Sequence, residues 1–135
     1  MTNKKNKGAK MKILHAMIRV KNINESMKFY TELLELNKTH EIKLEDCILH
    51  FLKDKDGDFE IELTENFDIP EHGYENGNAF GHFAFETKDM DAFTEKLANL
   101  GYTYLYEPFV MEEAQSKIAF VKDPDGNEIE IIEKI

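Results

Sequence analysis

The sequence predicts an α+β fold made of two copies of a β-α-β-β-β unit, whose curved mixed sheets enclose a cavity. Two observations carry this prediction. His15 and His82 are 67 positions apart, and Glu62 and Glu130 are 68 positions apart. Both halves also repeat one order of patterns: an apolar β-prone segment, an amphipathic stretch, then three more β-prone segments. This duplication indicates one structural unit used twice.

The first half begins with a predicted strand at residues 14–20, which are apolar and β-prone. Asn22, with Glu25 three residues later, predicts a helix N-terminus with a capping box. The apolar face of this helix consists of Ile23, Met27, Tyr30 and Leu34. Three further strands are expected near 39–44, 47–53 and 59–65. A tight turn at Asp56-Gly57-Asp58 joins the last two of them.

The second half repeats this order, beginning with a strand at residues 80–87. Asp89 is the predicted N-cap, 67 positions after Asn22, and Gly101 is the predicted C-terminal cap. The apolar face of this helix consists of Met90, Phe93, Leu97 and Leu100. Strands are expected near 103–107, 116–122 and 128–134. The segment Asp123-Pro124-Asp125-Gly126 has the residue preferences of a type I turn.

The chain has 135 residues, enough for one domain, whereas a half of about 60 residues is too short to bury a core alone. We therefore expect a single domain over residues 11–135. Its modules span about 11–66 and 80–135, and a linker at 67–79 lies between them. Residues 1–10 are rich in Lys and Asn and are predicted to form a disordered basic tail.

Composition restricts the function classes. The net charge is −10, and the residues from 13 onward contain 12 basic and 27 acidic side chains, so binding to nucleic acid is disfavoured. The sequence contains no run of 18 apolar residues, so no membrane-spanning helix is predicted. Cys47 is the only cysteine, which fits a reducing cytoplasm. Its apolar neighbours and the adjacent Asp46 disfavour a nucleophilic role.

Two histidines and two glutamates on strand-like segments form a ligand set for one divalent transition metal: His15, Glu62, His82 and Glu130. Imidazole nitrogen and carboxylate oxygen suit Zn²⁺, Ni²⁺, Co²⁺ and Fe²⁺. Taken singly, each residue has a structural explanation, as a hydrogen-bonded histidine or a solvated strand glutamate. Glu60 and Glu128 compete for the same strand faces, because alternate residues share a face. The duplicated spacing favours the metal site.

Several motifs resemble those of the glyoxalase I (lactoylglutathione lyase) family of the vicinal oxygen chelate superfamily. They are Leu14–Val20, Phe29-Tyr30, Ile61–Thr64, Gly81-His82, and Phe120–Gly126 with Ile129-Glu130. The resemblance runs from about Met11 to Glu133. It implies paired βαβββ modules and a homodimer with the site at the interface. His15 and Glu62 of one subunit would then join His82 and Glu130 of the other.

The implied enzyme is a carbon–sulfur lyase of methylglyoxal detoxification. It isomerises the hemithioacetal of methylglyoxal and glutathione, or a similar thiol, to S-D-lactoylglutathione. The resemblance favours Ni²⁺ or Co²⁺, with Zn²⁺ as the alternative, and a metal would stabilise the enediolate formed on deprotonation. Glu130 is the first choice of general base, with Glu62 able to take the counterpart role. Arg19 and Asn66 match positions that contact glutathione.

The sequence departs from the family in the loop Glu107–Gln115, which is acidic where members commonly place a basic residue, and at Asn78, where some members have arginine. Another low-molecular-weight thiol is therefore an alternative. Two other functions stay open: another superfamily enzyme on a different thiol adduct, such as an epimerase or thiol transferase, and a non-catalytic ligand-binding protein of the resistance type. The four ligand residues favour the enzyme. Related extradiol dioxygenases have no metal ligand at the position of Glu62, so this residue argues against that class of enzyme.

Overall fold

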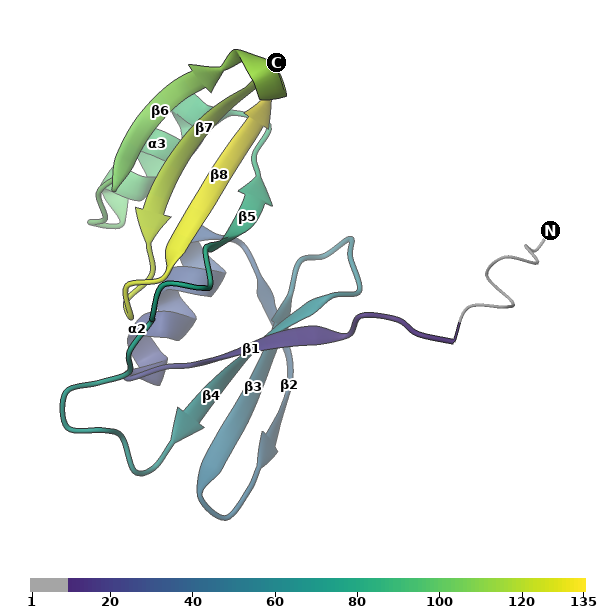
Figure 1. Cartoon of the computed structure of the whole chain (residues 1–135), viewed down its shortest axis with the longest axis vertical. Helices are drawn as coiled ribbons and strands as arrows, with labels where there is room; N and C mark the ends of the chain where they lie inside the picture. The colour runs from purple at the N-terminus through teal and green to yellow at the C-terminus, as the bar shows by residue number, and fades with distance from the viewer. Residues whose placement is uncertain (1–9) are drawn as a thin grey trace.

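A computed structural model describes residues 10–135, and the predicted basic tail lies almost wholly outside the described residues. The chain forms two four-stranded sheets (Figure 1). The first contains β1 (His15–Arg19), β2 (Asn37–Lys43), β3 (Cys47–Lys53) and β4 (Glu60–Asn66), in the order β1-β4-β3-β2. The second contains β5 (His82–Glu86), β6 (Tyr106–Met111), β7 (Ser116–Lys122) and β8 (Glu128–Lys134), in the order β5-β8-β7-β6. One pair in each sheet is parallel and the others are antiparallel, which confirms the predicted α+β fold with mixed sheets.

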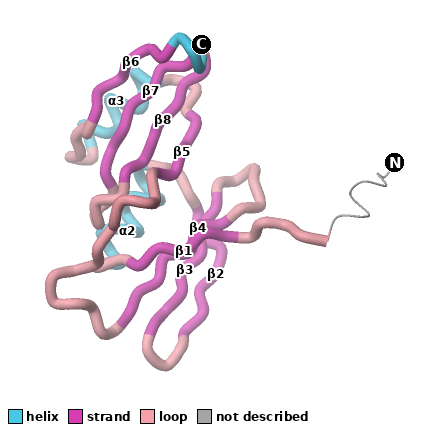
Figure 2. The backbone as a smooth tube through the Cα atoms, viewed as in Figure 1, coloured by secondary structure: helices cyan, strands magenta, loops and turns pink. Residues whose placement is uncertain are grey.

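In each half the helix follows the first strand of the sheet, at the position that the capping residues predict. The helix α2 (Ile23–Lys28) continues into a π-helical turn η1 (Phe29–Leu33), and α3 (Met90–Asn99) is the second helix. Asn22 accepts a hydrogen bond from the backbone N–H of Glu25 at 3.1 Å, and Asp89 accepts one from Ala92 at 3.0 Å. A short 3₁₀ helix, η2 (Glu112–Ala114), follows β6. Figure 2 shows α3 lying along one face of the second sheet.

The predicted β7–β8 turn is confirmed. The carbonyl oxygen of Asp123 accepts a hydrogen bond from Gly126 at 2.9 Å. The Asp123 carboxylate also accepts the backbone N–H groups of Asp125 and Asn127, at 2.9 and 2.8 Å. Gly126 has a φ of +88°, which favours glycine at this position. The sequence pattern was therefore sufficient for this turn, because its hydrogen bonds are local.

The strand expected near 103–107 was placed too early, since β6 spans Tyr106–Met111. The preceding Tyr104 packs on Phe93 of α3, and its hydroxyl lies 2.7 Å from that of Thr94, so the helix holds this segment. Pro108 lies within β6, where the register with β7 shifts between Tyr106 and Phe109. Proline is tolerated there because β6 is an edge strand with an irregularity.

The two halves share one cluster of buried apolar side chains. Its members include Phe29, Leu33, Leu52 and Leu63 from the first half, and Met90, Leu97, Val121 and Ile131 from the second. Two polar contacts also connect the halves. Tyr30 donates to the Asp123 carboxylate at 2.6 Å, and the backbone N–H of Lys21 donates to Asp125 at 2.9 Å. Burial, and then the charge of Asp123, raise the pKa of Tyr30, so its hydroxyl keeps the proton that it donates.

Across residues 10–135 there is no helix with both the length and the apolar character needed to cross a membrane.

Candidate metal centre

The first His–Glu pair lies on the adjacent parallel strands β1 and β4. Their register places Met17 opposite Glu62, and His15 lies two residues earlier on the same face. The Nε2 atom of His15 is 3.1 Å from Oε1 of Glu62. The glutamate side chain is only 8% exposed, whereas the imidazole is 40% exposed. A buried carboxylate therefore faces a histidine that is open on one side.

The second half repeats this arrangement. Ala84 of β5 lies opposite Glu130 of β8, and His82 lies two residues earlier on the same face. The Nε2 atom of His82 is 3.1 Å from Oε1 of Glu130. The side chains are 40% and 15% exposed, respectively. The duplicated sequence spacing thus corresponds to a duplicated geometry.

A phenylalanine supports each histidine ring, which the sequence reasoning missed. His15 packs edge-on against Phe51 at 5.6 Å between ring centroids, and His82 packs in the same way against Phe120 at 5.4 Å. Each phenylalanine is also the cross-strand partner of the pair's glutamate. The sequence does contain a signal that could have identified them: each phenylalanine is the fifth residue of its strand, and the two strands, β3 and β7, are duplicates of one another. These aromatic contacts restrict the orientation of the imidazoles.

The two pairs differ in how their glutamates are held. The hydroxyl of Thr64 donates to Oε2 of Glu62 at 3.2 Å, within a buried contact. The residue at the corresponding position after Glu130 is Ile132, which has no hydroxyl. Glu62 is therefore fixed by both of its oxygens, whereas only one oxygen of Glu130 has a partner that holds it among the described residues.

The two pairs do not combine within one chain. The part of the chain that the structure describes contains no group of three or more His, Cys, Asp or Glu side chains placed to hold a metal ion. A groove of about 1120 Å³ separates β5 from the segments 34–37 and 52–61 of the first half. His82 lines this groove, but the other three predicted ligands do not. A single chain thus carries two separate His–Glu pairs.

The donor atoms of each pair fit a shared cation. Imidazole nitrogen and carboxylate oxygen bind such metals at about 2.0–2.2 Å, so two ligands at right angles lie about 3.0 Å apart. The observed separation is 3.1 Å in both pairs. His15, Glu62, His82 and Glu130 are the residues that could hold the ion. A chelated cation would also offset the cost of burying the Glu62 carboxylate.

The competing glutamates of the sequence analysis are placed differently. Glu60 accepts a short hydrogen bond from Thr39, and His40 lies 3.9 Å away from it, so Glu60 is turned toward β2. Glu128 lies opposite His82 in the register, but the two side chains form no ion pair within 4.0 Å across residues 10–135. The geometry therefore pairs the histidines with Glu62 and Glu130.

The two predicted substrate contacts lie toward one end of the first sheet. Arg19 is exposed and shares the face of His15, and its guanidinium has no ion pair with any described residue. Asn66 ends β4 on the face of Glu62, and its Nδ2 donates to the hydroxyl of Tyr74 at 2.9 Å. From Glu62 to Asn66 the strand advances about 13 Å, at about 3.3 Å per residue.

Other reactive side chains have structural surroundings. Cys47 is buried, and burial, followed by a hydrogen bond and charge from Asp46, raises the pKa of its thiol, which is unfavourable for forming the nucleophilic thiolate. Buried His50 bonds to Glu65 at 3.0 Å, whereas His72 is exposed.

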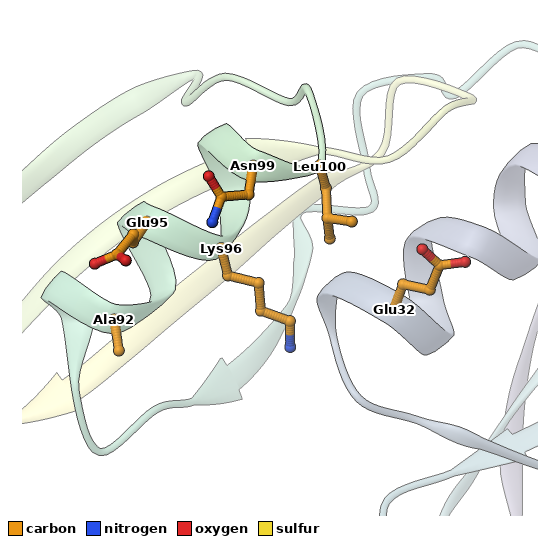
Figure 3. A pocket seen from close by; sticks show the side chains of 6 residues that line it. All are labelled: Glu32, Ala92, Glu95, Lys96, Asn99 and Leu100. Carbon is orange, nitrogen blue, oxygen red and sulfur yellow. The ribbon is translucent and has the colours of Figure 1, made fainter.

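A second hollow, of about 370 Å³, lies between α3 and the helical segment of the first half (Figure 3). Glu32, Glu95 and Lys96 are among its lining residues, and Lys96 forms an ion pair with Glu35 at 2.8 Å. None of the predicted ligands or substrate contacts lines this hollow. It is therefore separate from the candidate metal centre.

The fold and the paired His–Glu geometry define a class of protein that comparison with known sequences confirms. The chain belongs to the Glyoxalase/Bleomycin resistance protein/Dioxygenase superfamily, whose family model matches residues 12–131.

Within this superfamily, the similarity is to glyoxalase I. The chain is 39% identical over 127 residues to the lactoylglutathione lyase of Haemophilus influenzae, covering 91% of this chain and 93% of that protein. Glyoxalase I from Zea mays has a similar structure, with a TM-score of 0.80 and 30% identity. That match covers 90% of this chain and 44% of the maize chain, so this chain spans less than half the maize enzyme. The trypanothione-dependent glyoxalase I of Leishmania major matches with a TM-score of 0.76 and 29% identity, over 93% of this chain and 88% of that one. These comparisons confirm the predicted resemblance and the enzyme class that it implies.

Proposed function

We propose that this chain is a metal-dependent glyoxalase I. It isomerises the hemithioacetal of methylglyoxal and glutathione, or a similar thiol, to S-D-lactoylglutathione. The observation that carries the proposal is the duplicated His–Glu pair, with Nε2–Oε1 separations of 3.1 Å in both halves. The similarity to relatives named lactoylglutathione lyase supports the same reaction.

The active form is a homodimer, and each site takes His15 and Glu62 from one subunit and His82 and Glu130 from its partner. Two observations support this assembly. One chain keeps its two pairs apart, and no larger ligand group exists within residues 10–135. Large apolar side chains are also exposed: Met17, Phe59, Phe80, Tyr106, Phe109 and Val110 are each 38–54% exposed. Such exposed apolar surface is typical of an interface.

The bound ion is Ni²⁺ or Co²⁺, with Zn²⁺ as the alternative. A mixed set of two imidazoles and two carboxylates suits these borderline cations. When bound, the cation would polarise the oxygens of the substrate and so favour removal of the adjacent proton. The phenylalanines behind His15 and His82 would keep both imidazoles oriented toward it.

Glu130 is the proposed general base, which removes a proton from one carbon of the substrate and returns it to the neighbouring carbon. The different surroundings of the two glutamates support this choice. The Thr64 hydroxyl occupies Oε2 of Glu62, which suits a fixed ligand. Glu130 has Ile132 at the corresponding position, so its carboxylate has more freedom to move a proton. Glu62 takes the counterpart role: it is a metal ligand that is also able to accept the proton, from the opposite side of the substrate.

The thiol part of the substrate extends from the metal centre along the first sheet toward Arg19 and Asn66. The guanidinium of Arg19, which has no ion pair within residues 10–135, suits a carboxylate, which it could bind through two parallel hydrogen bonds. Asn66 offers amide groups about 13 Å further along β4 than Glu62. We propose a cytoplasmic location, because the single cysteine, Cys47, fits a reducing compartment. A single domain over 11–135 is also our proposal, supported by the shared core.

The test is thioester formation by protein that has been stripped with a chelator and then reconstituted. We expect no activity on the hemithioacetal of methylglyoxal and glutathione without metal, and recovery with Ni²⁺ or Co²⁺. The same assay with other low-molecular-weight thiols identifies the preferred adduct. Absence of turnover with every metal and every thiol would contradict the proposal and favour a ligand-binding protein.

A further inference from the structure

The segment between the two halves, residues 67–81, is fastened to both of them. Its Tyr74 accepts a hydrogen bond from Asn66 at the end of β4, at 2.9 Å. Two residues later, Asn76 donates to Asn127, beyond the β7–β8 turn, at 2.7 Å. The backbone N–H of Gly73 bonds to the carbonyl of Pro70 at 2.9 Å, and Gly73 has a φ of +79°. Tyr74 is therefore held on a framework that includes both modules.

Asn66 is the polar group that Tyr74 contacts, and it lies on the site face. Alternation along β4 places Asn66 with Thr64 and Glu62, and both of these face the candidate metal centre. An asparagine amide has two N–H donors on its nitrogen and one acceptor oxygen. In the structure Nδ2 is the amide atom engaged by the Tyr74 hydroxyl, which leaves Oδ1 as the available acceptor of the amide. The oxygen, Oδ1, has no hydrogen bond with any residue from 10 to 135.

We propose that Tyr74 is a positioning residue, which orients the Asn66 amide so that Oδ1 accepts an N–H group of the thiol substrate. This inference rests on the proposed function and adds a requirement on the substrate. Arg19 on the neighbouring strand β1 supplies positive charge for a carboxylate, and Asn66 supplies an acceptor. Together they select a peptide-like thiol that carries both a carboxylate and N–H donors.

The proposal predicts a specific kinetic change for Tyr74→Phe, which keeps the ring and removes only the hydroxyl. On the metal-loaded protein, we expect the KM for the glutathione hemithioacetal to rise about 3- to 10-fold, the effect of one neutral hydrogen bond. The kcat should change by less than about twofold, because the reacting carbons lie at the other end of the site. The matched control is Tyr104→Phe, which removes a hydroxyl contact to Thr94, remote from the site. If KM rises equally in Tyr74→Phe and Tyr104→Phe, or if kcat falls, the hydroxyl of Tyr74 has only a structural role. Either result would overturn the proposal.

A double-mutant cycle gives an independent test. If Tyr74 acts through Asn66, then Tyr74→Phe should have no further effect on KM in an Asn66→Ala background. Additive effects of the two substitutions would overturn the proposal. The hemithioacetal of 3-mercaptopropionate, which has a carboxylate but no N–H donor, should show a smaller difference between wild type and Tyr74→Phe than the glutathione adduct. An equal difference for the two adducts would also contradict it.

Binding of S-methylglutathione separates this inference from the proposed activity. This thioether has the peptide N–H groups and lacks the reacting carbonyl, so calorimetric titration of the metal-loaded protein reports recognition without turnover. We expect Tyr74→Phe to weaken its binding about 3- to 10-fold. If wild type fails to isomerise any hemithioacetal but shows this loss of binding, the proposed activity is wrong and the role of Tyr74 stands. Turnover by wild type with unchanged binding in Tyr74→Phe overturns only the role of Tyr74.

Discussion

The hydroxyl of Thr64 donates a hydrogen bond to Oε2 of Glu62 at 3.2 Å, in a buried contact between residues on one face of β4. The other oxygen of the same carboxylate lies 3.1 Å from His15. Both oxygens of Glu62 are thus directed by neighbours. This contact breaks the symmetry of the duplicated fold, because Ile132 follows Glu130 at the corresponding position.

Replacing Thr64 by valine should weaken metal binding about 10-fold, because groups that orient a ligand contribute about this much to affinity. Competition titration of Ni²⁺ against a chromophoric chelator measures the effect. Thr64→Ser retains the hydroxyl and is the matched control, for which we expect affinity close to wild type. Equal affinities for the valine and serine variants would show that the contact does not position Glu62.

Sharing of the site between subunits predicts complementation. His15→Gln and His82→Gln should each be inactive alone, because every site in either homodimer lacks one histidine. In a coexpressed mixture, each heterodimer regains one intact site of its two. Random pairing would therefore restore about a quarter of wild-type activity, measured as thioester formation. A mixture that stays inactive while forming heterodimers would locate the site within one chain.

Glu130→Gln should retain the metal but lose isomerase activity by about 100-fold or more, because an amide cannot act as the general base. Glu62→Gln should instead weaken metal binding more strongly than Glu130→Gln, since Thr64 holds Glu62 as a fixed ligand. Metal content and kcat are measured on the same samples. A full rate in Glu130→Gln would transfer the base role to Glu62.

Arg19→Ala should raise the KM for the glutathione adduct about 10- to 100-fold, the range for a hydrogen bond to a charged group. The kcat should change much less, because Arg19 lies four residues along β1 from His15. Arg19→Lys retains the charge but loses the paired donors, so an intermediate KM is expected. An unchanged KM in Arg19→Ala would point to a purely structural role.

The burial of Asp125 should make stability depend on pH in a defined direction. Burial raises the pKa of Asp125, although the Lys21 backbone hydrogen bond partly opposes this shift. The folded state therefore binds the proton more tightly than the unfolded state, and the free energy of unfolding falls as pH rises through the range above about 3.9. Asp125→Asn retains an acceptor for Lys21 and removes this dependence. The difference between variant and wild type, from urea unfolding, should grow with pH across that range and then level off. A constant difference would contradict the assignment.

Much of the fold could be predicted because its signals are local. The strands expected at 47–53, 116–122 and 128–134 match β3, β7 and β8. The N-caps Asn22 and Asp89 bond to backbone groups only three residues away. In contrast, β6 begins later than expected, and the preceding Tyr104 packs on α3 instead of continuing the strand. These contacts join residues ten and eleven positions apart, and no short sequence window contains them.

The sequence by itself determined which four residues are the candidate ligands and which face of its strand each one occupies. Strand alternation and the duplicated spacing are properties of the chain. The tertiary structure decided how closely each histidine approaches its glutamate, since the parallel registers of β1 with β4 and of β5 with β8 bring these atoms to 3.1 Å. It also decided that the two pairs stay apart in one chain and that Thr64 and Tyr74 hold Glu62 and Asn66. These relationships depend on side chains meeting across strands and loops, and only the packed structure fixes those distances.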